Sequence, residues 1–280
     1  MSLTSFSIRR SSVVPGFGLS LGYTLVYLSL IVLLPLGALV LNATGLGLSG
    51  LISIGLQPRV FAALKTSFTL ALAAAAVNVV FGLIVAWVLT RYDFPGRRLL
   101  DAAVDLPFAL PTAVAGIALT AIYAPTGPIG ALLAPLGWKI AFTPLGIIVA
   151  LVFIGLPFIV RTVQPVIQDL ERDVEEASAS LGADRLDTLR RVVLPTLAPA
   201  LLTGFALAFA RGVGEYGSVI FIAGNVPFVS EIAPLLIVVK LEEFNYEGAT
   251  AIALWMLALS FLILLSINLV QGWSRRRFGK

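Results

Sequence analysis

The chain has 280 residues, of which 59% are hydrophobic and only 12% are charged, with a formal net charge of +4. Soluble domains carry about 25% charged residues, so this composition predicts a protein that crosses a membrane several times. Histidine and cysteine are both absent, which excludes imidazole bases, thiolate nucleophiles, disulfides and the zinc sites built from these residues.

Six apolar segments are each long enough to cross the hydrocarbon core of a bilayer, which takes about 20 helical residues. Their hydrophobicity is continuous and does not alternate with a period of two, so they predict helices and not the strands of a barrel. The six predicted spans are residues 19–41, 61–90, 102–123, 142–160, 199–223 and 249–270. The predicted fold class is therefore an all-α membrane protein with six transmembrane helices.

The first span is too long for the core of a signal peptide and has further spans behind it, so we expect it to be retained. The polar, serine-rich residues 1–18 form a tail before it. Residues 42–60 and 124–141 are rich in glycine and proline, as connectors are. Residues 225–248 are predicted to hold a short helix or re-entrant element at 232–244. They form either a solvated connector or part of an outer face that meets a soluble delivery protein.

Basic residues gather on one side of the predicted spans. Of the 19 lysines and arginines, 14 fall in the tails and loops of one side, four fall on the other side, and Arg211 lies within a span. Basic loops stay in the cytoplasm, so both termini are predicted to be cytoplasmic. The net charge of +4 is then a consequence of topology, and no nucleic-acid partner is predicted.

Nucleotide-binding motifs are weak or absent. Residues 45–50 match the GxGxxG pattern, but they follow a predicted membrane helix, with no strand before them and no helix start after them. We therefore assign no dinucleotide site there. The chain has no GxxxxGK(S/T) motif, so ATP chemistry would have to come from a partner. The sequence predicts no cofactor and no metal site.

The most polar part of the chain is residues 169–195, between the predicted fourth and fifth spans. Acidic residues crowd its beginning and basic residues its end, which complements the helix dipole and predicts a helix-rich loop. The acidic residues are Asp169, Glu171, Asp173, Glu175 and Glu176, and the basic ones are Arg185, Arg190 and Arg191.

Apolar and small residues recur in this segment at three-to-four spacing and form one narrow stripe of a helix. They are Val174, Ala177, Ser178 and Leu181. Gly182 then permits the left-handed turn that ends a helix, and Asp184 can cap the helix that follows. At Leu194-Pro195 the chain is expected to bend into the fifth span.

The pattern Glu176-Ala177-Ser178, three residues, Gly182, nine residues and Val192-Val193-Leu194-Pro195 resembles the EAA signature of ABC-transporter permeases. Ser178 stands where alanine is usual, and Val192 where isoleucine is. The resemblance implies a docking loop for an ATPase subunit. The ATPase-coupling residues that it implies are Glu175, Glu176, Ala177, Ser178, Gly182, Leu194 and Pro195.

The same segment could instead lie on lipid headgroups as an amphipathic surface helix, with Arg190 and Arg191 as anchors. Such helices are usually basic throughout, whereas five acids open this one. Anionic lipid would repel those acids, so docking to a partner is the favoured interpretation.

The rest of the chain agrees with this resemblance. Residues 61–272 look like the five-helix core of the MetI-type permease fold, with one additional helix before it. Residues 208–225 closely resemble the sulfate/thiosulfate permease branch, in its T-type subunit. The resemblance implies alternating access at the cell inner membrane. The implied partners are two copies of an ABC ATPase subunit, a second homologous permease in a heterodimer, and a periplasmic sulfate- or thiosulfate-binding protein.

Arg211 and Glu215 are four residues apart in the fifth predicted span, so they can pair on one helix face. A single charge at the bilayer centre costs about 2.5–3.5 kcal/mol, so the pair should face protein or water. It is either a structural ion pair or part of a translocation path or gate. The candidate path residues are Arg211, Gly214, Glu215, Tyr216 and Gly217. Interhelical hydrogen bonds would explain two other polar residues near the spans, Asn78 and Gln164.

Other functions remain open at this point. Molybdate permeases resemble the sulfate branch. A secondary transporter would show inverted repeats and coupling acids in matched halves, but the chain shows one charged pair in one helix. An intramembrane hydrolase would need a nucleophile and a base in the bilayer, and no predicted span contains two acidic residues.

Overall fold

The computed structural model describes residues 17–278, and this part of the chain contains helices and no strands. Six segments are long and apolar enough to cross a membrane, namely Phe17–Thr44, Pro58–Arg91, Thr112–Leu136, Pro144–Asp169, Arg185–Val213 and Tyr246–Leu269. The all-α class and the number of spans are thus confirmed. Of the predicted tail, residues 1–16 lie outside the described part. The cytoplasmic location of both termini stays a prediction.

Three helices form the core. They are α4 (Pro58–Arg91), α9 (Pro144–Asp169) and α12 (Leu194–Val213). Ile159 of α9 is completely buried between the other two. A Cβ on Gly82 of α4 would lie 2.7 Å from Ile159 Cγ2, and one on Gly204 of α12 would lie 3.0 Å from Ile159 Cα. The two glycines therefore allow the helix backbones to approach closely, as small residues do in membrane proteins.

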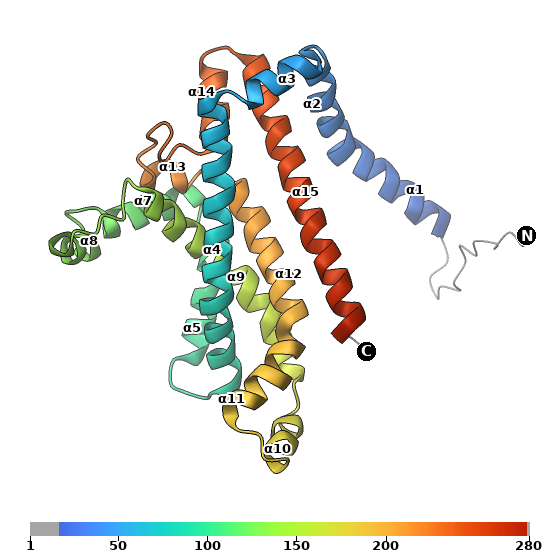
Figure 1. The fold of residues 1–280 in the computed structure, drawn as a ribbon, viewed down its shortest axis with the longest axis vertical. Helices are drawn as coiled ribbons and strands as arrows, with labels where there is room; N and C mark the ends of the chain where they lie inside the picture. Colours follow the sequence, from blue (N-terminus) through green and yellow to red (C-terminus); the bar gives the residue numbers. More distant parts are fainter. Residues whose placement is uncertain (1–16, 279–280) are drawn as a thin grey trace, which may run out of the picture.

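The first span stands apart from this core. It consists of α1 (Phe17–Leu28), a π-helical turn (Ser29–Leu33) and α2 (Leu34–Thr44), and α3 (Gly47–Gly55) follows it. No residue of α1 is buried, and this helix leans away from the others (Figure 1). The span joins the bundle near α3, where Trp255 Nε1 donates a hydrogen bond of 2.9 Å to the Leu51 carbonyl. The predicted connector at residues 42–60 thus contains a helix.

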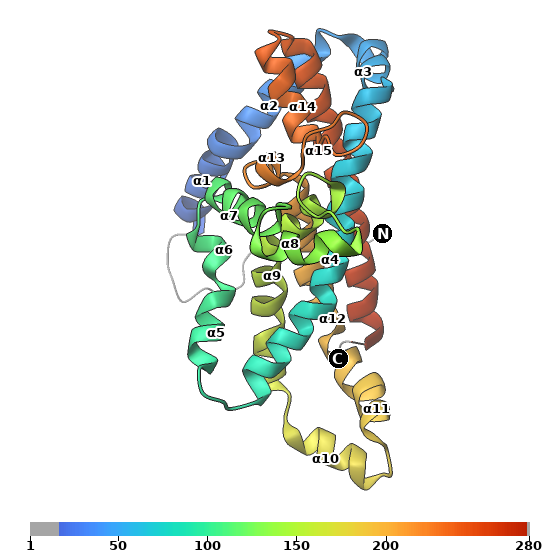
Figure 2. The ribbon, with the colours of Figure 1, turned by 90° about the vertical axis from the view of Figure 1, so that its left-hand side faces the viewer.

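The prediction of one helix over residues 102–123 is wrong. This part of the chain forms α5 (Arg97–Val104), α6 (Leu106–Ala109) and α7 (Thr112–Tyr123), followed by α8 (Pro128–Leu133) and a 3₁₀ turn (Ala134–Leu136). Leu110 is extended, with φ −87° and ψ 135°, because a proline, here Pro111, disfavours the helical conformation of the residue before it. From this break, α7 crosses in front of the core helices (Figure 2).

The predicted fourth and fifth spans need new boundaries. The fourth, predicted at 142–160, continues as α9 to Asp169. The fifth, predicted at 199–223, begins earlier and ends at Val213, and the short α13 (Val219–Ile222) follows the break. Glycine disfavours helix interiors, and Gly212, Gly214 and Gly217 lie at this break.

No break separates the coupling segment from the fifth span at Leu194-Pro195, and the bend predicted there stays a prediction. Helix α11 (Arg185–Thr188), a π-helical turn (Leu189–Val193) and α12 follow one another without interruption. Pro195 has no N–H to donate. The wider π turn just before it lets the helix continue past this missing donor.

The end of the bundle that carries α14 (Ala233–Glu242) lies opposite the end that carries α10 (Arg172–Ser180) (Figure 1). The short helix predicted at 232–244 is confirmed by α14. Glu231, just before it, is only 3% exposed and accepts hydrogen bonds from Arg59 Nε (2.9 Å) and Nη2 (2.7 Å). Ser67 Oγ accepts a further one from Ala233 N, at 2.8 Å. A segment that was only a solvated connector would leave Glu231 exposed. The burial of Glu231 therefore does not fit that interpretation. The final helix, α15 (Tyr246–Phe278), returns along the bundle.

We expect cysteines at the two ends to report opposite sides of the membrane. The chain has no cysteine, so Glu242→Cys in α14 and Ser180→Cys in α10 can be labelled selectively; both positions are exposed. An impermeant maleimide added to intact cells should label Glu242→Cys, and it should label Ser180→Cys only after permeabilisation. The reverse pattern would overturn the predicted orientation.

Candidate functional site

The predicted coupling segment folds as two short helices with a tight turn between them. Helix α10 ends at Ser180, and Gly182, two residues further on, has a φ of +86°, in the left-handed region. Asp184 Oδ1 accepts a 2.7 Å hydrogen bond from Asp187 N and caps α11. The sequence predicted both features, and both are confirmed. The turn forms the tip of the α10 end of the molecule (Figure 2).

Large apolar side chains are exposed on this segment. Leu181 is 89% exposed, and Val174 and Leu186 are exposed as well. Val174 and Leu181 lie between the candidate membrane spans, so lipid chains do not explain their exposure. Exposed apolar patches surrounded by polar residues are typical of protein-binding surfaces.

The predicted coupling residues do not form one surface. Glu176 and Ala177 are exposed on α10, whereas Glu175 Oε1 lies 2.6 Å from Arg91 Nη2 of α4. Ser178 Oγ is 3.0 Å from Thr188 Oγ1 and so ties α10 to α11.

Two of these residues belong elsewhere. Leu194 and Pro195 are partly buried in the continuous helix that leads into α12, outside the α10–Gly182–α11 tip. The structure therefore brings together Glu176, Ala177, Ser178 and Gly182 at that tip.

Arg211 and Glu215 form the predicted ion pair, with Nη1 and Oε2 2.6 Å apart. The Glu215 side chain is 2% exposed and that of Arg211 is 36% exposed. Glu215 Oε1 also accepts hydrogen bonds from Ser218 N (2.8 Å) and Ser218 Oγ (3.0 Å). The pairing is confirmed but its placement is corrected, because α12 ends at Val213 and Glu215 lies in the turn beyond it.

This turn packs tightly against α7. A Cβ on Gly217 would lie 2.2 Å from Thr112 Oγ1, and one on Gly116 would lie 2.4 Å from the Ser218 carbonyl. Gly217 is therefore required for close approach. Tyr216 is partly buried in the same turn, whereas a side chain on Gly214 would meet nothing within 4 Å.

A second cluster of charges, centred on Arg161 of α9, was not predicted as a site. Arg161 donates five hydrogen bonds, to both Asp105 carboxylate oxygens, to Asp101 Oδ1 and its carbonyl, and to Gln164 Oε1, at 2.6–2.8 Å. These bonds use all five N–H groups of a guanidinium. The predicted span ended at residue 160, which put Arg161 in a loop, but the predicted interhelical role of Gln164 is confirmed by its 3.1 Å bond to Asp101.

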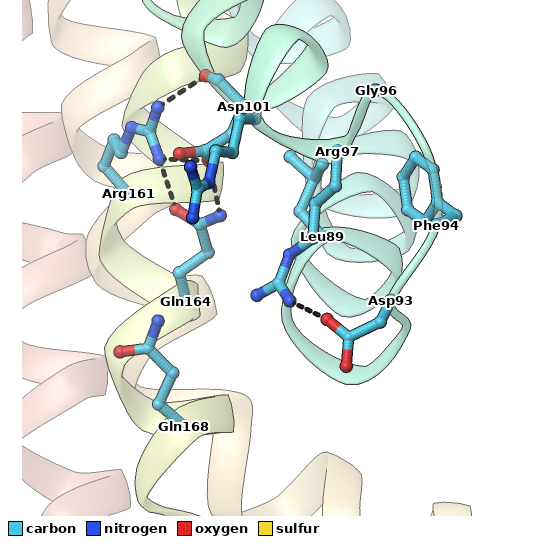
Figure 3. A pocket seen from close by; sticks show the side chains of 10 residues that line it. Leu89, Asp93, Phe94, Gly96, Arg97, Asp101, Arg161, Gln164 and Gln168 are labelled. Carbon is cyan, nitrogen blue, oxygen red and sulfur yellow. Dashed lines mark hydrogen bonds and ion pairs between the residues drawn. The ribbon is translucent and has the colours of Figure 1, made fainter.

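The cluster lines one wall of a cavity of about 660 Å³ between α4, α5 and α9 (Figure 3). Hydrogen bonds from Gln164 and Arg161 lower the pKa of the Asp101 carboxyl below its usual value. Asp101 therefore stays ionised opposite Arg161. The arrangement holds α5 and α6 against α9.

The interhelical hydrogen bond predicted for Asn78 is not formed among the described residues. Its side chain is fully buried in α4, and neither its amide nitrogen nor its oxygen has a hydrogen-bond partner among the described residues. A Cβ on Gly155 of α9 would lie 2.5 Å from Asn78 Nδ2. Asn78 thus packs between helices without bonding them.

Comparison with solved structures identifies the fold. The fold superposes on one chain of a bacterial alginate ABC transporter in complex with an alginate pentasaccharide-bound periplasmic protein, with a TM-score of 0.73 and 16% identity, over 93% of this chain and 94% of that one. It also resembles the MetNI methionine ABC transporter, with a TM-score of 0.56 and 19% identity, over 76% of this chain and 94% of that one. The fold is that of an ABC importer permease.

Sequence comparison shows the family. Residues 78–280 match the model described as "binding-protein-dependent transport system inner membrane component", and the chain belongs to this family. It is 50% identical over 278 residues to the sulfate transport system permease protein CysT of Salmonella typhimurium, covering 99% of this chain and 98% of that protein. It is 49% identical over 275 residues to CysT of Escherichia coli, covering 98% of each.

Family membership settles the class of function. The chain is a multi-pass inner-membrane permease subunit, a non-catalytic component that works with a separate ATPase and a substrate-binding protein. This family assignment rules out the secondary-transporter and hydrolase interpretations. Within the described residues no group of three or more acidic side chains could hold a metal ion.

The Arg211–Glu215 pair yields a stability prediction. Arg211→Met leaves the Glu215 carboxylate buried and unpaired, and breaking a buried pair costs about 3–5 kcal/mol, or less here because Arg211 is partly exposed. Arg211→Met with Glu215→Gln removes the stranded charge and keeps an acceptor for Ser218. The double variant should therefore unfold in detergent at a higher temperature than Arg211→Met alone. Equal or lower stability of the double variant would show that the residues are not coupled.

Proposed function

We propose that this chain is a permease subunit of an ATP-driven importer of sulfate or thiosulfate. The observation that supports this substrate is the near full-length identity of about half to CysT relatives, which are sulfate transport permeases. Molybdate remains the alternative oxyanion. Residues 61–272 act as the transmembrane domain, residues 19–41 as an additional first helix, and residues 1–18 as a cytoplasmic tail.

The translocation path or gate lies around Arg211, with Gly214, Glu215, Tyr216 and Gly217 beside it. One N–H of Arg211 bonds Glu215, and no other hydrogen bond from its guanidinium is found to the described residues. The partly exposed guanidinium keeps donors that suit a tetrahedral oxyanion. Arg161, in contrast, has every donor occupied inside the chain, so of these two arginines Arg211 is the one that can meet the substrate.

The ATPase docks on the tip formed by α10, Gly182 and α11. The exposed Leu181 and the exposed Glu176 and Ala177 supply an apolar and acidic surface outside the spans, which supports this assignment. The assembly has two ATPase copies and two homologous permeases in a heterodimer. A periplasmic binding protein delivers the anion at the α14 end.

The substrate proposal predicts loss of uptake when the Arg211 pair is neutralised. In proteoliposomes of the complete importer, Arg211→Met with Glu215→Gln should assemble but take up labelled sulfate at least about tenfold more slowly, within the usual range of site coupling. The matched control is Arg59→Met with Glu231→Gln, which neutralises another arginine–glutamate pair. Wild-type uptake in the Arg211 variant would make that pair structural. Uptake of labelled molybdate without uptake of labelled sulfate by the wild-type importer would overturn the sulfate assignment.

The docking proposal predicts a weaker ATPase complex for Gly182→Val. A left-handed conformation costs a side-chain-bearing residue about 1–2 kcal/mol, which is about tenfold in affinity. Gly96 offers a matched control, since its φ is +85° and no other side chain or backbone atom lies within 4 Å of a Cβ added there or at Gly182. Gly96→Val should co-purify with the ATPase as wild type does. Equal ATPase retention by both variants would remove the support for docking at this tip.

A further inference from the structure

Helix α10 is attached to the membrane bundle by few contacts. None of its residues with a described side chain is buried, and it packs on α11. Among the described residues, the side-chain hydrogen bond that joins the core to α10 comes from α4. Arg91, the last residue of α4, donates through Nη2 to Glu175 Oε1 at 2.6 Å and to the Leu170 carbonyl at 3.0 Å.

Arg91 is held firmly in place. Its side chain is 13% exposed, and its guanidinium carbon lies 5.3 Å from the ring centre of Trp87, one helical turn earlier. Exposed ion pairs contribute little because both side chains move freely and water screens them. A guanidinium that is buried and stacked on an aromatic ring loses much of that freedom, so Arg91 is more constrained than the Glu175 side chain that it bonds.

No close packing duplicates this connection. A cavity of about 660 Å³ separates the end of α4 from α10 and α11, lined by residues that include Trp87, Tyr92, Glu176, Ala183 and Arg185. Without the ion pair, this gap would let α10 move relative to α4. The pair spans the gap at one side.

We propose that the Arg91–Glu175 ion pair transmits movement of α10 to α4 during transport. Glu175 is then a positioning residue bonded to the permease core. Glu176 lies on the same gap and is exposed. This inference rests on the proposed docking of the ATPase at α10. The ion pair would carry movement of α10 into α4, in addition to the chain connections that join α10 to α9 and α12.

The test measures sulfate uptake and ATP hydrolysis together in proteoliposomes of the complete importer. Arg91→Glu should keep the ATPase bound and hydrolysing, while uptake per ATP falls about tenfold, within the usual range of coupling between sites. Glu175→Gln should lower the same ratio with less disturbance of folding. Arg91→Glu with Glu175→Arg restores an ion pair of reversed polarity and should recover most of the ratio.

A static role would not produce this recovery. An unchanged ratio of uptake to hydrolysis in Arg91→Glu and Glu175→Gln would overturn the inference, as would a double variant no better than the poorer single one. Loss of the ATPase from Glu175→Gln alone would make Glu175 a docking residue, which also overturns it while leaving the docking proposal intact. Failure of the docking proposal is detected by a separate measurement, the comparison of ATPase retention between Gly182→Val and Gly96→Val.

Discussion

Ile159 lies where α9 crosses α4 and α12, with its side chain against Gly82 and its backbone close to Gly204. In a bilayer the hydrophobic effect does not drive helices together, so close van der Waals packing of this kind has to hold them. The crossing sets the angles of the three helices and therefore the positions of their ends. Arg59, Arg91 and Arg211, which pair with peripheral segments, lie near those ends.

Each core helix uses an arginine to hold a peripheral segment. Arg59 and Arg91, near the two ends of α4, bond Glu231 before α14 and Glu175 in α10. Arg161 of α9 holds α5 through Asp101 and Asp105, and Arg211 of α12 holds the following turn through Glu215. The planar guanidinium suits this task because it bonds a carboxylate at two points and stays charged. Apolar packing shapes the core, and ion pairs orient what surrounds it.

Local sequence signals predicted local features well. Continuous hydrophobicity located the spans, glycine chemistry predicted the left-handed Gly182, and helix spacing predicted the Arg211–Glu215 pair. The break at Leu110 was missed because the apolar run continues through it, although Pro111 was a signal that could have revealed it. Arg59 and Glu231 are 172 positions apart, and no spacing rule joins residues that only the tertiary fold brings together.

Asn78 was predicted wrongly for a similar reason, since a polar residue in a span normally finds a partner on the next helix. In this conformation it has none, and an unpaired buried amide raises the free energy of the conformation by about 1–3 kcal/mol. An importer must visit more than one arrangement of its helices, and their free energies have to stay within reach of one another. The buried, unpaired amide of Asn78 therefore makes this packing of α4 against α9 less stable than a fully paired amide would.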